Sequence, residues 1–266
     1  MSHRFSARAY DGERSSGLGA GWSLGLGPKL RPNQRSAALS LGMGASWLKP
    51  QGGGDGGLSV GGSVGLGYSS VVSRVDPRAG TRAGAQVGSS LAFTNGETSM
   101  AFVTSAGVSR LVDLGGGHVL GARLSWASQW GAPQENQKLG VGGRSGIRGA
   151  APFALTGKHR VSASMEWRHP FTRDLSVDFL RVAWFEGVDG VFFVDGVGLA
   201  EEPGGLGRSA GWSLGFGYGI RLHYLLSGVN PMVLFLDTGV PVALGGDWSL
   251  LERPQMVLLT GLGQSF

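Results

Sequence analysis

Two arginines stand among glycines near the middle of the chain, in residues 142–149, which read Gly-Gly-Arg-Ser-Gly-Ile-Arg-Gly. They lie inside a long, turn-rich connection that covers about residues 131–158. A guanidinium carries five N–H donors in a planar fork, so Arg148 needs carboxylates or other acceptors once it leaves water. The glycines around it, which include Gly149, would let the backbone approach a protein wall closely. The segment therefore predicts a buried ion-pair site.

A set of charged residues follows in the second half of the chain, at positions that alternate with large apolar ones, and its carboxylates could pair with Arg148. The set is Glu166, Arg168, Asp195, Arg221 and Asp237. Such alternation places them on the face of a strand that also carries Gly and Ser. We expect the loop to fold inward and Arg148 to pair with Glu166 and Asp195. A merely polar lining without such a pair is the other interpretation.

Other chemistry-bearing patterns point away from catalysis. The G-x-S-x-G pattern occurs at residues 21–25 and 211–215, but it requires a strand-to-helix turn, and both copies lie within unbroken alternation. The five His residues have no metal-ligand spacing, and the Gly-rich residues 52–57 lack the Lys-Ser/Thr pair of a phosphate loop. We therefore expect no enzyme activity, no metal and no cofactor.

Period-2 alternation runs through almost the whole chain. In residues 211–224, every even position is large and apolar or aromatic, and every odd position is Gly, Ser, Arg or His. A soluble sandwich could give this pattern, but strand after strand would then expose a face of Gly and Ser. A transmembrane barrel puts the apolar face toward lipid and the small, polar face toward the lumen. We predict an all-β, antiparallel transmembrane barrel of about twelve strands, about seven of them before the central loop, in a single domain over residues 1–266.

Composition agrees with a large β domain. The 266 residues include 50 Gly and 8 Trp, only 15% are charged, and there is no Cys. The net charge of +5 is scattered along the chain, which argues against nucleic-acid binding and suits arginines that meet outer-membrane lipid and lipopolysaccharide at a membrane rim. No apolar run is long enough for a transmembrane helix, and the first residues do not resemble a signal peptide. We expect the natural chain to begin further upstream.

Loop lengths predict which end of the barrel faces outward. If the central connection is extracellular, the short connections at 28–34, 76–80, 115–117 and 226–231 are periplasmic, as barrels of this kind require. The exception is residues 171–189, where Val182-Ala183-Trp184-Phe185 suits an extra strand, a plug element or a helix at the membrane edge. The chain then ends at the periplasmic face, with Gly261 and the terminal Phe266 in the last strand.

Several motifs, taken in order, resemble one family. They are Gly142-Gly143 with Ile147-Arg148-Gly149, Met165-Glu166-Trp167-Arg168-His169-Pro170, Phe193-x-Asp195, Gly217-x-Gly219-Ile220-Arg221, Asp237 through Pro241, and the terminal Phe266. Together they resemble the C-terminal barrel of the BamA/TamA-type outer-membrane assembly and secretion superfamily, also called bacterial surface antigens. The resemblance is specific over residues 139–266. By it, Ile147-Arg148-Gly149 is the loop motif that enters the lumen, and Asp195 and Glu166 are the acidic residues that meet it.

The resemblance also has departures and functional implications. Ala150 replaces an aromatic residue, Val197 replaces a glycine, and family barrels have sixteen strands, which is the alternative to our count. The resemblance implies a bacterial outer-membrane protein that inserts or translocates client polypeptides at the seam between the first and last strands, with periplasmic POTRA domains encoded upstream. Alternatives are a structural or pore-forming barrel without clients, and a membrane anchor for an upstream enzyme domain.

Overall fold

The computed structural model describes most of the chain, over residues 2–11, 15–26, 35–50, 57–71, 76–94, 97–133, 138–142, 146–150, 155–173, 175–179, 183–207, 211–227, 230–243 and 257–262. The strands before the central loop are β1 (Ser2–Asp11), β2 (Ser15–Leu26), β3 (Ser36–Pro50), β4 (Gly57–Ser69), β5 (Gly80–Thr94), β6 (Glu97–Gly115) and β7 (His118–Gly131). Those after it are β10 (His159–Thr172), β11 (Val177–Phe179), β12 (Ala183–Ala200), β13 (Trp212–Leu226), β14 (Asn230–Ala243) and β15 (Val257–Leu262).

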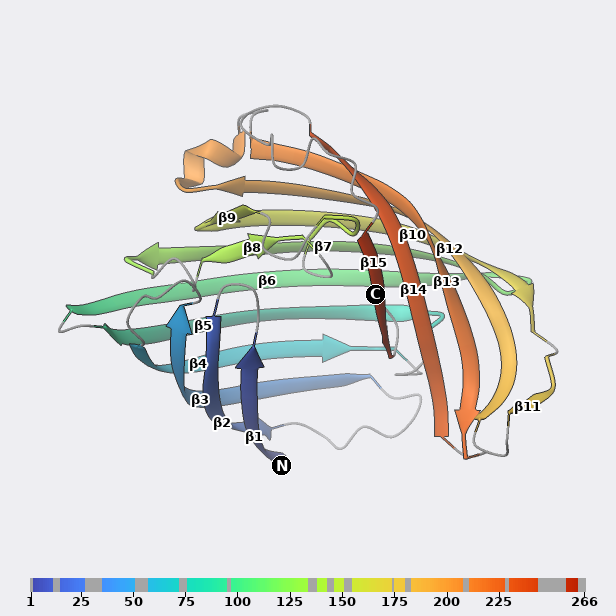
Figure 1. Ribbon diagram of the computed structural model, residues 1–266, viewed down its shortest axis with the longest axis horizontal. Helices are drawn as coiled ribbons and strands as arrows, with labels where there is room; N and C mark the ends of the chain where they lie inside the picture. Colours follow the sequence, from blue (N-terminus) through green and yellow to red (C-terminus); the bar gives the residue numbers. More distant parts are fainter. Residues whose placement is uncertain are drawn as a thin grey trace.

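These strands form a single antiparallel sheet of 13 strands, which curves strongly (Figure 1). Twelve of them follow one another in the order β1 to β7, then β10, β12, β13, β14 and β15, while β11 pairs with β12 alone. In the described residues, the main path thus has the expected twelve strands, seven of them before the central loop. Within the described residues, β1 and β15 are the two ends of this order.

The two faces of the sheet differ as the alternation predicts. Large apolar side chains lie exposed on the outer face, among them Leu66 at 65%, Met43 at 63% and Phe216 at 53% exposure. Buried side chains on the inner face include charged ones, such as Glu166 at 1% and Arg221 at 0%. A soluble protein buries the first kind and exposes the second, so this inside-out distribution is that of a membrane-spanning barrel.

A short turn joins β6 to β7. Gly115, Gly116 and Gly117 adopt positive φ angles of 81°, 58° and 92°, a conformation that glycine adopts without the steric cost of a side chain. This explains how two long neighbouring strands reverse direction within so few residues.

Of the three alternatives for residues 182–185, the structure supports the strand, but not as a separate one. Ala183, Trp184 and Phe185 are neither a plug nor a helix but the first residues of β12, where it pairs with β11 and with β13. The expected connection at residues 171–189 is corrected accordingly, because β12 begins within it. The register of β12 against β13 shifts between Phe185 and Gly187, which marks a bulge at Glu186. An extra residue reverses the phase of alternation, so the period-2 pattern breaks there and hides a continuous strand. Val182 lies outside the described residues.

The central connection contains structure of its own. Two short strands, β8 (Leu139–Val141) and β9 (Leu155–Gly157), form a separate two-stranded sheet, where the sequence predicts only a turn-rich loop. A 3-10 helix, η3 (Pro203–Gly207), follows β12. In the part of the chain that the structure describes, no helix is long and apolar enough to cross a membrane. Gly261 lies in β15 opposite Phe235, whereas Phe266 lies outside the described residues.

Candidate functional site: the buried charge network of the central loop

Six charged side chains meet on the inner face of four neighbouring strands. Their exposed fractions are all 6% or less. They are Arg148 of the loop, Glu166 and Arg168 of β10, Asp195 of β12, Arg221 of β13 and Asp237 of β14. Because β10, β12, β13 and β14 are adjacent in the sheet, inward-facing positions on each strand converge there. Three cations and three anions make the set neutral as a whole.

Arg148 binds Asp195 through both its side chain and its backbone. Its Nε donates to Oδ2 of Asp195 at 2.9 Å, and its Nη2 donates to Oδ1 at 2.9 Å. The backbone N–H of Arg148 also donates to Oδ2, at 3.0 Å. Two parallel bonds from a guanidinium to a carboxylate fix orientation as well as distance. The third bond fixes the loop backbone itself against β12.

The remaining surface of the Arg148 guanidinium is also occupied. Its Nη1 donates to Oε2 of Glu166 at 3.3 Å, and its Nη2 donates to Oγ of Ser164 at 3.1 Å. Nη1 lies 3.7 Å from Oδ2 of Asp237. The guanidinium carbon sits 3.7 Å from the centre of the Phe193 ring, a cation–π contact. The arginine is thus held on its edges by acceptors and on one face by an aromatic ring.

Glu166 links Arg148 to a second arginine. Its Oε1 accepts from Nε and Nη2 of Arg168, at 2.8 and 2.6 Å. Nη1 of Arg168 donates to the carbonyl of Pro77 at 2.9 Å, so the network reaches the connection between β4 and β5. Asp76 of the same connection lies 3.9 Å from Arg168. The connection between β4 and β5 is thereby joined to β10, which is not its neighbour in the sheet.

Arg221 and Asp237 form the third part of the network. Nη1 and Nη2 of Arg221 donate to the two carboxylate oxygens of Asp237, the second at 3.2 Å. The space for this pair comes from Gly219, because a Cβ there would collide with Oδ1 of Asp237. The structure thus brings the residues expected on the lumenal face into a single connected network.

The loop backbone docks on a surface of glycines. Gly149 has a φ of 98°, and a Cβ on it would collide with the carbonyl of Gly239 on β14. A Cβ on Gly215 of β13 would likewise collide with the side chain of Ile147. Glycine at these positions is required for the loop to lie directly on the wall. The three residues Ile147, Arg148 and Gly149 therefore contact β12, β13 and β14 together.

Ala150 and Val197, the two departures from the motif that the sequence resembles, lie in one hydrophobic cluster. They are 2% and 0% exposed and pack with Val141 and Ile147. By the resemblance, Ala150 replaces a larger residue and Val197 a smaller one, so the two changes act in opposite directions on the volume of the cluster.

The sequence did not single out several members of the site. Ser164 accepts a bond from Arg148 and donates one to Asp195 at 2.7 Å. Its position two residues before Glu166, on the same face of β10, is the signal that could have identified it. Phe193 is part of the motif Phe193-x-Asp195, but the sequence did not assign it a contact with Arg148. The carbonyl of Pro77 carries no signal in the sequence.

The arrangement has the chemistry of a structural lock. Each cation faces carboxylates and each carboxylate faces cations, which offsets the high cost of moving charge out of water. Ser213 of the second G-x-S-x-G pattern is 0% exposed, lies on β13 and donates to the carbonyl of Val242 at 2.9 Å. It therefore lacks the exposed turn of a nucleophile. In the described residues, no group of three or more His, Cys, Asp or Glu side chains could hold a metal ion.

Comparison with solved structures identifies the fold. The barrel of BamA from Haemophilus ducreyi lacking POTRA domains 1–3 matches 94% of this chain with a TM-score of 0.59, at 15% sequence identity. The chain has the BamA barrel fold. CdiB from Acinetobacter baumannii matches 93% of the chain with a TM-score of 0.44, also at 15% identity. The chain spans 54% of the BamA chain and 50% of the CdiB chain, about half of each. No protein-family model matches the sequence, and neither does any curated protein.

Proposed function

We propose that this protein is a bacterial outer-membrane barrel that inserts or translocates client polypeptides, and that the clients engage the seam between β1 and β15. The observation that carries the proposal is the BamA barrel fold over 94% of the chain. The site adds to it, because the buried network fixes the loop through polar contacts and presents no exposed nucleophile or metal centre. We therefore propose a role in moving or folding polypeptides rather than in catalysis.

The ends of the sheet supply a place for a client strand. Within the described residues, β1 and β15 end the strand order. In the described residues, β15 pairs with β14 antiparallel, from Leu234–Leu262 to Gly239–Val257. A strand edge carries N–H and C=O groups that can pair with an incoming strand.

The loop contributes by holding together the strands that lie next to β15 in the sheet. Arg148 ties β10, β12 and, at longer range, β14 to one guanidinium. Movement at the seam would then leave these strands in place. Periplasmic POTRA domains, if encoded upstream, would deliver clients to the same end of the barrel as the short turns.

Site-specific photo-crosslinking tests the proposal. A photoreactive amino acid is placed singly at Phe5 and Ala7 of β1, at Leu259 of β15, and at Val64 of β4 as a control. Val64 is 50% exposed on the outer face but lies in the middle of the strand order. The barrel is reconstituted in liposomes, and an unfolded outer-membrane barrel is added as client. Adducts at the β1 and β15 positions, with none at Val64, are expected.

Two outcomes would refute client handling at the seam. One is equal crosslinking at Val64 and at the seam positions, which indicates non-specific contact through the lipid. The other is a rate of client folding that equals the rate in protein-free liposomes, with no adduct at any position.

A pore is a second candidate, favoured by the inner wall of β3 and β4. The residues facing inward there are small, such as Ser40, Gly42, Ser63 and Gly65. The loop residues Ile147, Arg148 and Gly149 contact strands on the other side of the sheet instead. Small polar residues are typical of a water-filled lumen. Steady conductance in planar bilayers, without any client, would favour this function over insertion.

A further inference from the structure

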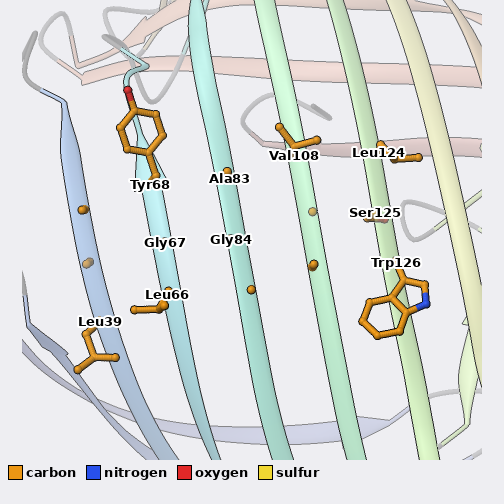
Figure 2. Close-up of a pocket in the computed structure, with 15 residues that line it drawn as sticks. Leu39, Leu66, Gly67, Tyr68, Ala83, Gly84, Val108, Leu124, Ser125 and Trp126 are labelled. Carbon is orange, nitrogen blue, oxygen red and sulfur yellow. The ribbon is translucent and has the colours of Figure 1, made fainter.

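A shallow apolar groove runs along the outer face of β3 to β7. Its volume is about 780 Å³. Small residues form its floor, including Ala83, Ala85 and Ala106, and larger side chains stand at its sides. Figure 2 shows Leu66 and Tyr68 of β4 on one side of β5, and Val108 of β6 with Trp126 of β7 on the other. The groove therefore forms where small side chains lie between larger ones on the apolar face.

A cation follows the groove on the same outer face of β6, one outward-facing position beyond its lining residue Val108. Arg110 lies two residues beyond Val108 on β6, and its partner across the sheet is Thr81, two residues before Ala83 on β5. Arg110 is exposed, and its Nη1 donates to Oγ1 of Thr81 at 3.2 Å. That bond uses one of the five donors of the guanidinium and directs the side chain toward β5.

The position of Arg110 along β6 places it near the membrane interface. Among the outward-facing residues of β5 and β6 that the structure describes, it alone is charged. It lies five residues before Gly115, where the short turn begins. A cation on the lipid-facing side of a barrel is costly at the membrane centre and tolerated near the interface. There it meets phosphate groups, which the planar guanidinium binds through two donors at once.

We propose that the groove binds one acyl chain of an anionic phospholipid whose phosphate group is held by Arg110. The apolar floor and sides take up the chain, and Arg110 selects the head group by charge. With the short turns on the periplasmic side, the lipid belongs to the periplasmic leaflet. This site is independent of client handling, because it lies on the middle of the outer wall and not at the seam.

Fluorescence quenching by brominated lipids tests the site. Trp126 is 39% exposed and lines the groove, so bromine on an acyl chain in the groove quenches it. The folded barrel is reconstituted in phosphatidylcholine with either brominated phosphatidylglycerol or brominated phosphatidylcholine. The signal of Trp126 is the difference between the original protein and Trp126→Phe. We expect about five-fold tighter binding of phosphatidylglycerol, the factor that corresponds to one arginine at a membrane surface.

Matched variants separate head-group recognition from general contact with lipid. Arg110→Gln should abolish the preference, and Arg110→Lys, which keeps the charge, should retain it. Lys138→Gln makes the same charge change in the central connection, where Lys138 pairs with Glu201 at 3.0 Å, and should leave the preference intact. Heat-modifiable migration on gels checks that each variant is folded.

Three results overturn the proposal. The first is equal quenching of Trp126 by both lipids in the original protein. The second is an unchanged preference in folded Arg110→Gln. The third is a Trp126 that neither lipid reaches because a second copy of the barrel covers the groove.

Discussion

Arg148→Ala is the change that most directly weakens the inner network. It removes two side-chain bonds to Asp195, one to Glu166 and one to Ser164. The network of six charged residues then changes from neutral to one net negative charge. Asp195 is only 1% exposed, so water does not compensate its charge. Breaking a buried ion pair from one side costs about 3–5 kcal/mol because the remaining charge is uncompensated.

The structure places the effect toward the lower end of that range. After the substitution, Asp195 still accepts from the backbone N–H of residue 148 and from Ser164, provided the loop stays docked. We therefore expect a loss of about 3 kcal/mol in the free energy of unfolding. Arg148→Lys keeps the charge but loses the fork, and should cost about 1–2 kcal/mol.

The assay combines unfolding with proteolysis. Urea titration in detergent micelles gives the free energy of unfolding, semi-native gels give the heat stability of the folded barrel, and limited proteolysis reports on the loop. Lys138→Ala is the control, because its exposed pair with Glu201 should contribute at most about 1 kcal/mol. The reasoning is wrong if Arg148→Ala has the heat stability and the protease resistance of the original protein.

Three further outcomes follow from the geometry. Gly149→Ala should release the loop to protease, because its Cβ meets the backbone of Gly239, whereas Gly204→Ala, with open space around it, should not. An epitope tag inserted at Gly204 should be labelled on intact cells and a tag at Ala79 should not, and the reverse labelling would invert the orientation. Ala150→Phe should destabilise the folded barrel by about 1–3 kcal/mol through overpacking, and adding Val197→Gly should recover part of that loss, as measured by urea unfolding. If the effects of Ala150→Phe and Val197→Gly on the free energy of unfolding are additive, the two side chains do not occupy a common space in the cluster.

Alternation accounts for most of what the sequence predicts correctly. A period of two fixes both the presence of a strand and the direction of each side chain, so β13 and the inward position of Arg221 follow from the pattern alone. The same rule gathers the charged residues of β10, β12 and β14 on one face. Which cation meets which anion depends on the order of strands in the sheet, and here that order is sequential.

The sequence did not predict the features at which period-2 alternation is interrupted or absent. The bulge at Glu186 reverses the phase of β12, so the pattern assigns the first residues of the strand, from Ala183 on, to the connection at 171–189. The β8–β9 hairpin is only three residues long on each side, too short for periodicity to register. The docking surface depends on glycines, and in a chain with 50 of them the few that receive the loop carry no distinctive signal.

A single-cysteine scan of β6 tests the central claim, that the sheet spans a membrane with its apolar face toward lipid. The chain has no cysteine, so spin labels can be placed one at a time over residues 102–110. In liposomes, labels at Phe102, Val108 and the even positions between them should collide freely with oxygen, which concentrates in lipid. Labels at the odd positions should be protected from oxygen. Equal exposure of both sets, or the opposite phase, would contradict a membrane-spanning barrel.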